Sequence, residues 1–341
     1  MKILATMLGA AVASIALTGA ALGQEVTLRL HHFLPAQATI PAKAITPWTQ
    51  KIEQESGGRI KFELYPAMQL GGGPPNLYDQ AKDGVVDVIW TVLGYAPGRF
   101  PKSEVFEMPF MVTTGEATSV AFQEFVEANT MDEFEGVKLI AVHTHGPGLF
   151  HTKSPIAKLE DLGGMKVRGG SRVISDMLTR LGAEAIGMPV PATTEALSKG
   201  VIDGTTIPWE VAPSIRTSEM VTNHTGFAGT NGLYTQTFAL VMNQASYDKL
   251  PDDLKAVIDN NSGTEVAALF GRVMDEGDIA GRKQAEGMGN AIVTLDETET
   301  ARWKAAAQAT IDQWLADVSA RGIDGEALYD SATALVAKHT K

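Results

Sequence analysis

The spacing of apolar residues between positions 26 and 91 switches repeatedly between the strand period and the helix period. Apolar residues at every second position predict strands, whereas apolar residues three and four positions apart predict helices. The predicted strands are residues 26–33, 59–65 and 85–91, and the predicted helices are residues 42–55 and 76–82. Glycine-rich turns separate these segments, so the pattern predicts a β-α-β-α-β unit.

The middle of the chain repeats this plan. Strands are predicted over 165–168, 185–188 and 201–207, with a helix from Ser171 to Gly182 and a short one capped by Thr193 or Thr194. Similar tetrapeptides introduce the last strand of each unit, Gly84-Val85-Val86-Asp87 and Gly200-Val201-Ile202-Asp203. Because βαβ crossovers are right-handed, each unit should form its own sheet covered by helices. Two α/β lobes with a cleft between them are therefore expected.

The C-terminal part of the chain is helical by pattern from Gly263 onward. One apolar stripe runs from Val266 to Val273, and a second runs from Trp303 to Leu315. The acidic residues 296–299 stand at the start of the later helix, where negative charge favours the helix dipole. Amphipathic stripes of this kind are typical of core packing. We expect long C-terminal helices that pack against the lobes.

Residues 1–23 have the pattern of a secretory signal peptide. One lysine precedes a run of small and apolar residues that ends in Ala21-Leu22-Gly23. A membrane anchor is the alternative, since the run approaches the ~20 residues that span a bilayer. The small residues at its end favour cleavage, so a periplasmic protein is expected. With no cysteine in the chain, a large apolar core has to supply its stability.

Charge and motif content narrow the possible functions. The 341 residues carry a formal net charge of -12 without a basic cluster, which argues against nucleic-acid binding. No nucleophile elbow, phosphate-binding loop or metalloprotease motif occurs. His143 and His145 could share one face of a strand, but no third zinc ligand is recognisable by spacing. We therefore expect no metal, no cofactor and no enzymatic activity, although an enzyme acting on a small acid stays possible.

Arg168 is the strongest candidate for ligand binding. It ends a short apolar strand and is followed by Gly169-Gly170-Ser171, where a helix begins. The carboxyl edge of an open α/β sheet is where ligands collect, and a guanidinium can grip a carboxylate with two parallel hydrogen bonds. A surface arginine paired with a nearby acid is the alternative.

Several segments together resemble one protein family. They are the motif around Ser56 to Ile60, Tyr65-Pro66-Ala67, Gln69-Leu70-Gly71, Gly163 to Arg168, Gly187-Met188-Pro189, Leu197 to Gly204 and Leu250 to Leu254. In order and spacing they are similar to the DctP-type solute-binding proteins of tripartite ATP-independent periplasmic (TRAP) transporters. The likeness runs over nearly the whole mature chain.

The resemblance implies a two-lobed, type II-like periplasmic binding protein fold in the α/β class, each lobe a β-sheet flanked by helices. Lobe I would comprise residues 24–145 plus 234–273, and lobe II residues 146–233 plus 274–341. It also implies capture of a small organic acid and its delivery to the membrane subunits of a TRAP permease. The family's carboxylate clamp falls on Arg168. We expect a monomer, with a dimer through the C-terminal helices left open.

Two departures from the family pattern bear on the ligand. Residues 146–152 lack a second arginine, and Ile207 stands where an asparagine is common. A pocket with one charge clamp and aromatic walls would suit an aromatic or 2-oxo monocarboxylate. The candidate ligand-binding residues are Arg168, Trp209, Trp90, Tyr95, His31, Phe33, His145, Phe150, Glu210 and Tyr234.

Some of these candidates have competing interpretations. Trp209 could equally be a core residue, and an exposed surface position is the default for Glu210. The resemblance implies that an acidic residue in the place of Glu210 can help to hold a cation beside the ligand. A secreted enzyme and an extracytoplasmic sensor subunit remain as alternative functions.

Overall fold

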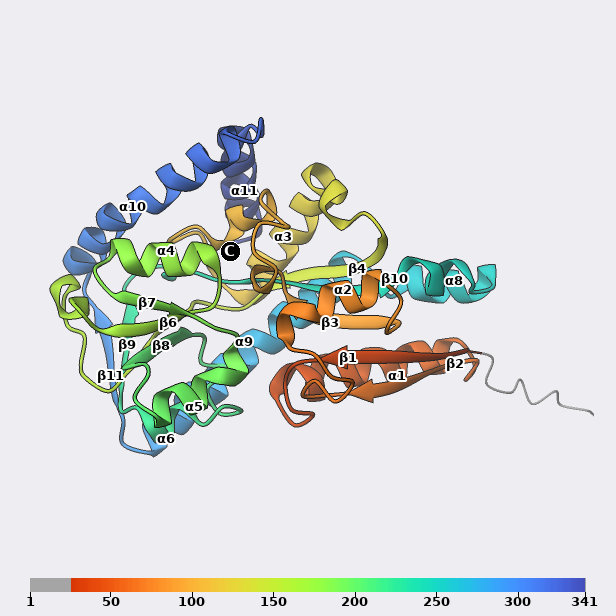
Figure 1. The fold of residues 1–341 in the computed structure, drawn as a ribbon, viewed down its shortest axis with the longest axis horizontal. Helices are drawn as coiled ribbons and strands as arrows, with labels where there is room; N and C mark the ends of the chain where they lie inside the picture. The colour runs from red at the N-terminus through yellow and green to blue at the C-terminus, as the bar shows by residue number, and fades with distance from the viewer. Residues whose placement is uncertain (1–25, 341) are drawn as a thin grey trace, which may run out of the picture.

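The computed structural model describes residues 26–340. The predicted signal peptide, residues 1–23, lies outside the described residues. Across residues 26–340, no helix has the length and apolar character needed to cross a membrane. Two mixed sheets and their covering helices form two lobes, with the strands of the first sheet on the right of Figure 1 and those of the second on the left.

Lobe I is built on a five-stranded sheet in the order β2-β1-β3-β10-β4. The strands β1, β2 and β3 are parallel, whereas β10 runs antiparallel to both of its neighbours. The bounds are β1 Val26–His32, β2 Ile60–Tyr65, β3 Val88–Val92, β4 Val137–Thr144 and β10 Thr237–Asn243. Helices of this part are α1 Thr46–Glu55, α2 Leu77–Lys82, α3 Gly115–Asn129, α7 Gln244–Asp248 and α8 Asp252–Asn260.

Lobe II is built on a six-stranded sheet in the order β11-β9-β5-β8-β6-β7. The bounds are β5 Leu149–Thr152, β6 Lys166–Gly169, β7 Glu184–Gly187, β8 Gly204–Ile207, β9 Asn223–Phe227 and β11 Ala291–Leu295. Its helices are α4 Arg172–Arg180, α5 Thr193–Ser198 and α6 Thr217–Met220. Ser171 caps α4 as predicted, since its side chain accepts a hydrogen bond from the backbone N–H of Ile174. The predicted threonine cap of α5 is wrong, because Ala192 occupies that position without a side-chain cap.

The two similar tetrapeptides make the same structure in each lobe. Gly84 and Gly200 have φ values of +73° and +69°, a left-handed conformation that glycine adopts without strain. The Asp87 carboxylate then accepts a hydrogen bond from the backbone N–H of Arg29 at 2.9 Å. The Asp203 carboxylate accepts one from Lys166, also at 2.9 Å. Each aspartate thereby ties its segment to the neighbouring strand of its own sheet, β1 or β6.

Three long helices connect the lobes. They are α9 Thr264–Gly287, α10 Glu297–Ser319 and α11 Gly325–His339. The helix α9 packs against α3 and β4 of lobe I and runs between the two sheets in Figure 1. Helix α10 packs on α4 of lobe II, and α11 then packs on α3 of lobe I. Two consecutive β-α-β units would need a single crossing from one lobe to the other. The chain crosses between the lobes again in its C-terminal helices.

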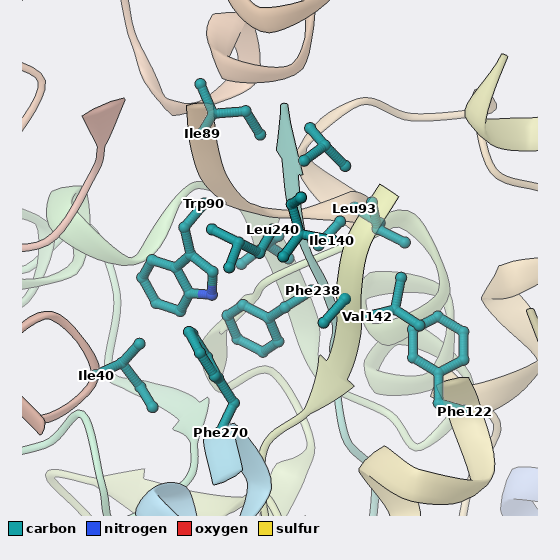
Figure 2. Packing of buried hydrophobic residues seen from close by; sticks show 14 of the residues in the cluster. Ile40, Ile89, Trp90, Leu93, Phe122, Ile140, Val142, Phe238, Leu240 and Phe270 are labelled. Atoms are coloured by element: carbon teal, nitrogen blue, oxygen red, sulfur yellow. The ribbon is translucent and has the colours of Figure 1, made fainter. Parts of the chain in front are cut away.

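The larger apolar core surrounds the sheet of lobe I. Trp90 on β3 is buried and stacks on Phe238 of β10, with ring centroids 5.3 Å apart and an interplanar angle of 9°. Figure 2 shows these two rings beside Phe270 of α9. The indole N–H of Trp90 donates a hydrogen bond to Nε2 of His143 at 2.8 Å, so its one polar atom is satisfied inside the core.

The carboxyl group of Glu107 links the two lobes. It lies in the short 3₁₀ helix Ser103–Glu107, and its side chain is 1% exposed. One oxygen accepts hydrogen bonds from the backbone N–H and hydroxyl of Thr237, at the start of β10. The other accepts a hydrogen bond of 2.5 Å from the hydroxyl of Ser171, at the start of α4. Glu107 therefore joins a strand of lobe I to a helix of lobe II.

Burial of Glu107 predicts a pH-dependent contribution to stability. Burial raises its pKa from an ordinary value of about 4.5 to about 7. Between these two values the unfolded chain loses the proton while the folded chain keeps it, so the free energy of unfolding falls as the pH rises. The isosteric variant Glu107→Gln has no carboxyl group at this position and therefore takes up or releases no proton there. Relative to that variant, the free energy of unfolding of the wild type, measured in urea titrations, should fall by up to about 3 kcal/mol between pH 4.5 and 7.5.

The exposed variant Glu135→Gln serves as the control for this prediction, because Glu135 lies in a loop at the surface. The free energy of unfolding of Glu135→Gln should show the same pH dependence as that of the wild type. Parallel pH profiles for the wild type and Glu107→Gln would show that the Glu107 carboxyl titrates alike in the folded and unfolded states.

Candidate ligand-binding site

A cavity lies between the lobes. Most of its wall comes from the carboxyl ends of strands, which is where open α/β sheets place their ligands. Lobe I supplies the residues that follow β1, β3 and β4, and lobe II supplies those at the ends of β6, β7 and β8. The lining residues are Phe33, Leu34, Trp90, Val92, Tyr95, His145, Arg168, Val190, Ile207, Pro208, Glu210, Val211, Gln236, Phe238 and Met274.

Aromatic side chains of lobe I form one wall of the cavity. Phe33 stacks on Trp90, with ring centroids 4.8 Å apart and an interplanar angle of 9°. Phe238 stacks on the same indole, and Tyr95 meets the ring of Phe33 edge-on at 5.6 Å. The hydroxyl oxygen of Tyr95 accepts a hydrogen bond from the backbone N–H of Val190 in lobe II at 2.9 Å. The aromatic wall is thus rigid and is tied to the opposite lobe.

Arg168 supplies a buried positive charge. It lies on β6 and its side chain is fully buried. Its Nε donates a hydrogen bond to the carbonyl oxygen of Met188 at 2.8 Å, and its Nη1 donates one to the carbonyl oxygen of Thr206 at 3.2 Å. The remaining nitrogen, Nη2, is buried and has no hydrogen-bond partner within residues 26–340. Two backbone carbonyls therefore fix the guanidinium beside the Tyr95 hydroxyl, and Nη2 lies too far from any acceptor of the described residues for a hydrogen bond of good geometry.

His145 and Gln236 lie beside this arginine. His145 accepts a hydrogen bond at Nε2 from the backbone N–H of Gln236 and donates one from Nδ1 to the carbonyl oxygen of Gly146. Burial, together with the positive charge of Arg168 and against the hydrogen bond to Gly146, lowers the pKa of His145 to about 4. The imidazole is therefore neutral at ordinary pH. The side-chain Nε2 of Gln236 is a second buried donor without a partner in the described structure.

Glu210 contributes a carboxyl group to the cavity wall. Its side chain is 3% exposed, so the default expectation of an exposed surface glutamate is wrong. Burial raises its pKa to about 7, against the opposing effect of contacts with the Thr39 hydroxyl and the backbone of Ile40. One carboxyl oxygen, Oε1, is buried without a hydrogen-bond partner in the part of the chain described here.

Six of the ten predicted residues line this single cavity: Phe33, Trp90, Tyr95, His145, Arg168 and Glu210. They come from separate parts of the sequence, between positions 33 and 210. Their roles in ligand binding stay predictions.

The structure places the other four candidates elsewhere. Phe150 packs against Trp303 in the core of lobe II, with ring centroids 5.5 Å apart. Trp209 packs among Leu149, Ala285 and the rings of His151 and His224, facing away from the cavity-lining set. Phe150 on β5 thus belongs to the core of lobe II, and Trp209 belongs to a small apolar cluster between lobe II and α9.

His31 and Tyr234 also lie outside the lining set. Nδ1 of His31 is 2.7 Å from the side-chain oxygen of Gln80, and its Nε2 accepts a hydrogen bond from the backbone N–H of Leu70. The ring of His31 therefore holds the loop that contains Leu70 next to the end of β1. Tyr234 is buried behind His145, whose ring it meets at 90° and 5.4 Å. It supports a lining residue without lining the cavity.

Gln236 and Phe238 line the cavity but were not among the predicted site residues. Gln236 immediately precedes β10, and Phe238 is its second residue. The predicted lobe boundaries also assign this strand to lobe I. Gln236 packs so closely on Gly170 that a Cβ on this glycine would lie 2.2 Å from the side-chain oxygen of Gln236. The neighbouring Gly169-Gly170 pair was noted in the sequence, but nothing local to Gln236 indicates that its side chain meets this turn.

The described residues, 26–340, contain no cluster of three or more histidine, cysteine, aspartate or glutamate side chains arranged to hold a metal ion. His143, which was considered with His145 as a zinc pair, accepts the hydrogen bond of Trp90 in the core. Burial lowers the pKa of His143 to about 3.

Solved structures of similar proteins share the whole two-lobed fold. A TRAP solute-binding protein from Rhodoferax ferrireducens T118, in complex with copurified benzoate, is 49% identical, with a TM-score of 0.91 over 92% of this chain and 98% of that one. A marine-metagenome TRAP solute-binding protein specific for aromatic acid ligands, in complex with 3-hydroxybenzoate, is 47% identical, with a TM-score of 0.92 over 93% of this chain and 100% of that one.

A curated relative and a family model agree with these structures. The C4-dicarboxylate-binding periplasmic protein DctP of Rhodobacter capsulatus is 24% identical over 89% of this chain and 90% of its own length. The model of the DctP family, described as bacterial extracellular solute-binding protein, family 7, matches residues 30–317. The chain therefore belongs to the DctP family of bacterial extracellular solute-binding proteins, and its solved neighbours serve TRAP transporters.

Proposed function

We propose that this protein captures an aromatic monocarboxylate between its lobes and delivers it to the membrane subunits of a TRAP transporter. The unpaired Nη2 of the buried Arg168 is the observation that carries the proposal. A buried cation without an anionic partner is costly, and the carboxylate of a ligand would remove that cost.

The geometry of the cavity supports a small aromatic acid. Arg168 Nη2 and Gln236 Nε2 are two donors for one carboxylate. The stacked wall of Phe33, Trp90 and Phe238 offers flat apolar contact to a ring.

The solved relatives support the same ligand class. The two proteins that are 49% and 47% identical to this chain hold benzoate and 3-hydroxybenzoate. Both identities are high enough, over nearly full length, for the ligand class to be proposed here. An aliphatic 2-oxo acid, the other class expected from the sequence, lacks a flat ring for the aromatic wall.

Export to the periplasm and a purely binding role complete the proposal. Residues 1–23 would direct export, and the mature protein would act as a monomer that meets the permease.

A secreted enzyme acting on the acid is the alternative. Both ring nitrogens of His145 and the hydroxyl of Tyr95 are already occupied by backbone groups. Overnight incubation with benzoate should therefore return benzoate unchanged by chromatography, and formation of any product would favour the enzyme.

Arg168→Ala should abolish binding of benzoate. Loss of a buried, hydrogen-bonded charge partner costs about 2–5 kcal/mol, so the dissociation constant measured by calorimetry should rise at least about thirtyfold. The ligand-free variant should stay folded, because no carboxylate of residues 26–340 loses an ion-pair partner. Arg180→Ala, at the exposed end of α4, is the control and should bind as the wild type does. Binding by Arg168→Ala within a few fold of wild type would contradict the clamp.

The charge and shape of the ligand should both matter in a thermal-shift assay. Benzoate should raise the melting temperature, because a ligand that binds only the folded state stabilises it. Benzamide has the same ring without the charge, and succinate carries a second carboxylate for which the lining residues offer no second cation. Neither should produce a comparable shift at the same concentration. A succinate shift equal to that of benzoate would assign the protein to dicarboxylates.

A further inference from the structure

Three polar atoms of the cavity wall lack a hydrogen-bond partner within the described part of the chain. Two are the donors Nη2 of Arg168 and Nε2 of Gln236, and the third is Oε1 of Glu210. The donors match a carboxylate. A carboxyl oxygen and a carboxylate are both hydrogen-bond acceptors, so Oε1 of Glu210 would pair with a different group on the ligand.

The position of Glu210 is fixed by elements other than those that hold Arg168. Its backbone N–H donates a hydrogen bond of 2.7 Å to the carboxylate of Asp278 on α9. A Cβ on Gly277 would lie 2.5 Å from Cγ of Glu210, so only a glycine allows the side chain to lie this close to the helix. The carboxyl group also contacts the Thr39 hydroxyl and the backbone of Ile40.

These contacts leave Oε1 of a firmly held carboxyl group without a hydrogen-bond partner among the described residues, on a residue that lines the cavity. The guanidinium of Arg168 is held separately, by the carbonyl oxygens of Met188, just after β7, and Thr206 on β8. The lining residues on either side of Glu210 in sequence, Pro208 and Val211, are apolar and offer Oε1 no side-chain donor.

We propose that Glu210 determines specificity by binding a hydroxyl group on the ring of the ligand, so that hydroxylated aromatic acids are the preferred ligands. The inference rests on the proposed function and adds a second polar contact to it. A hydroxyl group can donate to an ionised carboxylate or accept from a protonated carboxyl, so it pairs with Glu210 in either state.

The selectivity follows from the cost of an unpaired buried oxygen. Oε1 of Glu210 is buried and unpaired in this structure, and a ligand with a bare ring would leave it so, whereas a hydroxyl group on the ring would pair with it. Sites that hydrogen-bond a hydroxyl group discriminate strongly against analogues that lack it. Burial raises the pKa of Glu210 to about 7, so a protonated fraction at neutral pH limits its repulsion of an anionic ligand.

Calorimetry on the wild type tests this with benzoate, the three hydroxybenzoates and the three methylbenzoates. A methyl group has nearly the size of a hydroxyl group, so each pair at one ring position isolates the hydrogen bond from the shape. At one ring position, the hydroxybenzoate should bind at least about tenfold more tightly than its methyl partner.

Two variants assign the preference to Glu210. Glu210→Met keeps the length of the side chain without its oxygens and should bring the hydroxyl-to-methyl affinity ratio close to one. Glu210→Gln keeps both a donor and an acceptor and should retain the preference. Glu133→Gln is the matched control, because Glu133 is a glutamate whose pKa burial also raises to about 7, but it bonds Ser103 away from the cavity. Its ratio should equal that of the wild type.

Equal binding of each hydroxyl and methyl pair by the wild type would overturn the inference, as would an undiminished preference in Glu210→Met. If that variant does not fold, the wild-type pairs decide alone. Failure of the wild type to bind benzoate or any other member of the panel would instead overturn the proposed function. Binding of benzoate without an advantage for hydroxyl groups leaves the proposed function in place and refutes only the role of Glu210.

Discussion

The site depends on one buried positive charge that has no negative partner among residues 26–340. Burial of an ion is costly, and the protein offsets part of this cost with two backbone carbonyls that accept hydrogen bonds from Arg168. The carbonyls also orient the guanidinium, so a ligand meets a donor that needs no rearrangement. An internal carboxylate in their place would have neutralised the charge and removed the reason for an anion to bind.

The two lobes contribute different chemistry to the proposed site. Lobe II supplies the charge, whereas lobe I supplies the stacked aromatic wall around Trp90. Full contact with the proposed ligand would therefore require both lobes together. The contacts of Tyr95 with Val190 and of Glu107 with Ser171 also join the lobes in this structure. A ligand held between the lobes would stabilise the same arrangement as these contacts, which is how binding is coupled to hinge closure.

Much of the fold follows from local signals in the sequence. The alternation of apolar residues and the glycine stops predicted the first strands and helices of both lobes, and Ser171 capped the helix that it was expected to cap. Arg168 could be selected because it ends a strand before two glycines, and ligands collect at the carboxyl edge of an α/β sheet. The tetrapeptides ending in Asp87 and Asp203 were recognised as equivalent, although their shared hydrogen bond to a neighbouring strand was not.

What the sequence could not provide is the identity of each side chain's neighbours across the cleft. Trp209 and Glu210 are adjacent, yet the tryptophan packs in a small apolar cluster with Leu149 and Ala285 while the glutamate lines the cavity. Helix α9 packs closely on both residues: a Cβ on Gly281 would lie 2.1 Å from the carbonyl oxygen of Trp209, and a Cβ on Gly277 would lie 2.5 Å from Cγ of Glu210. Two glycines far along the chain therefore help to set which of the two side chains lines the cavity. Propensity and spacing carry no information about such a contact, because it exists only after the chain has crossed between the lobes.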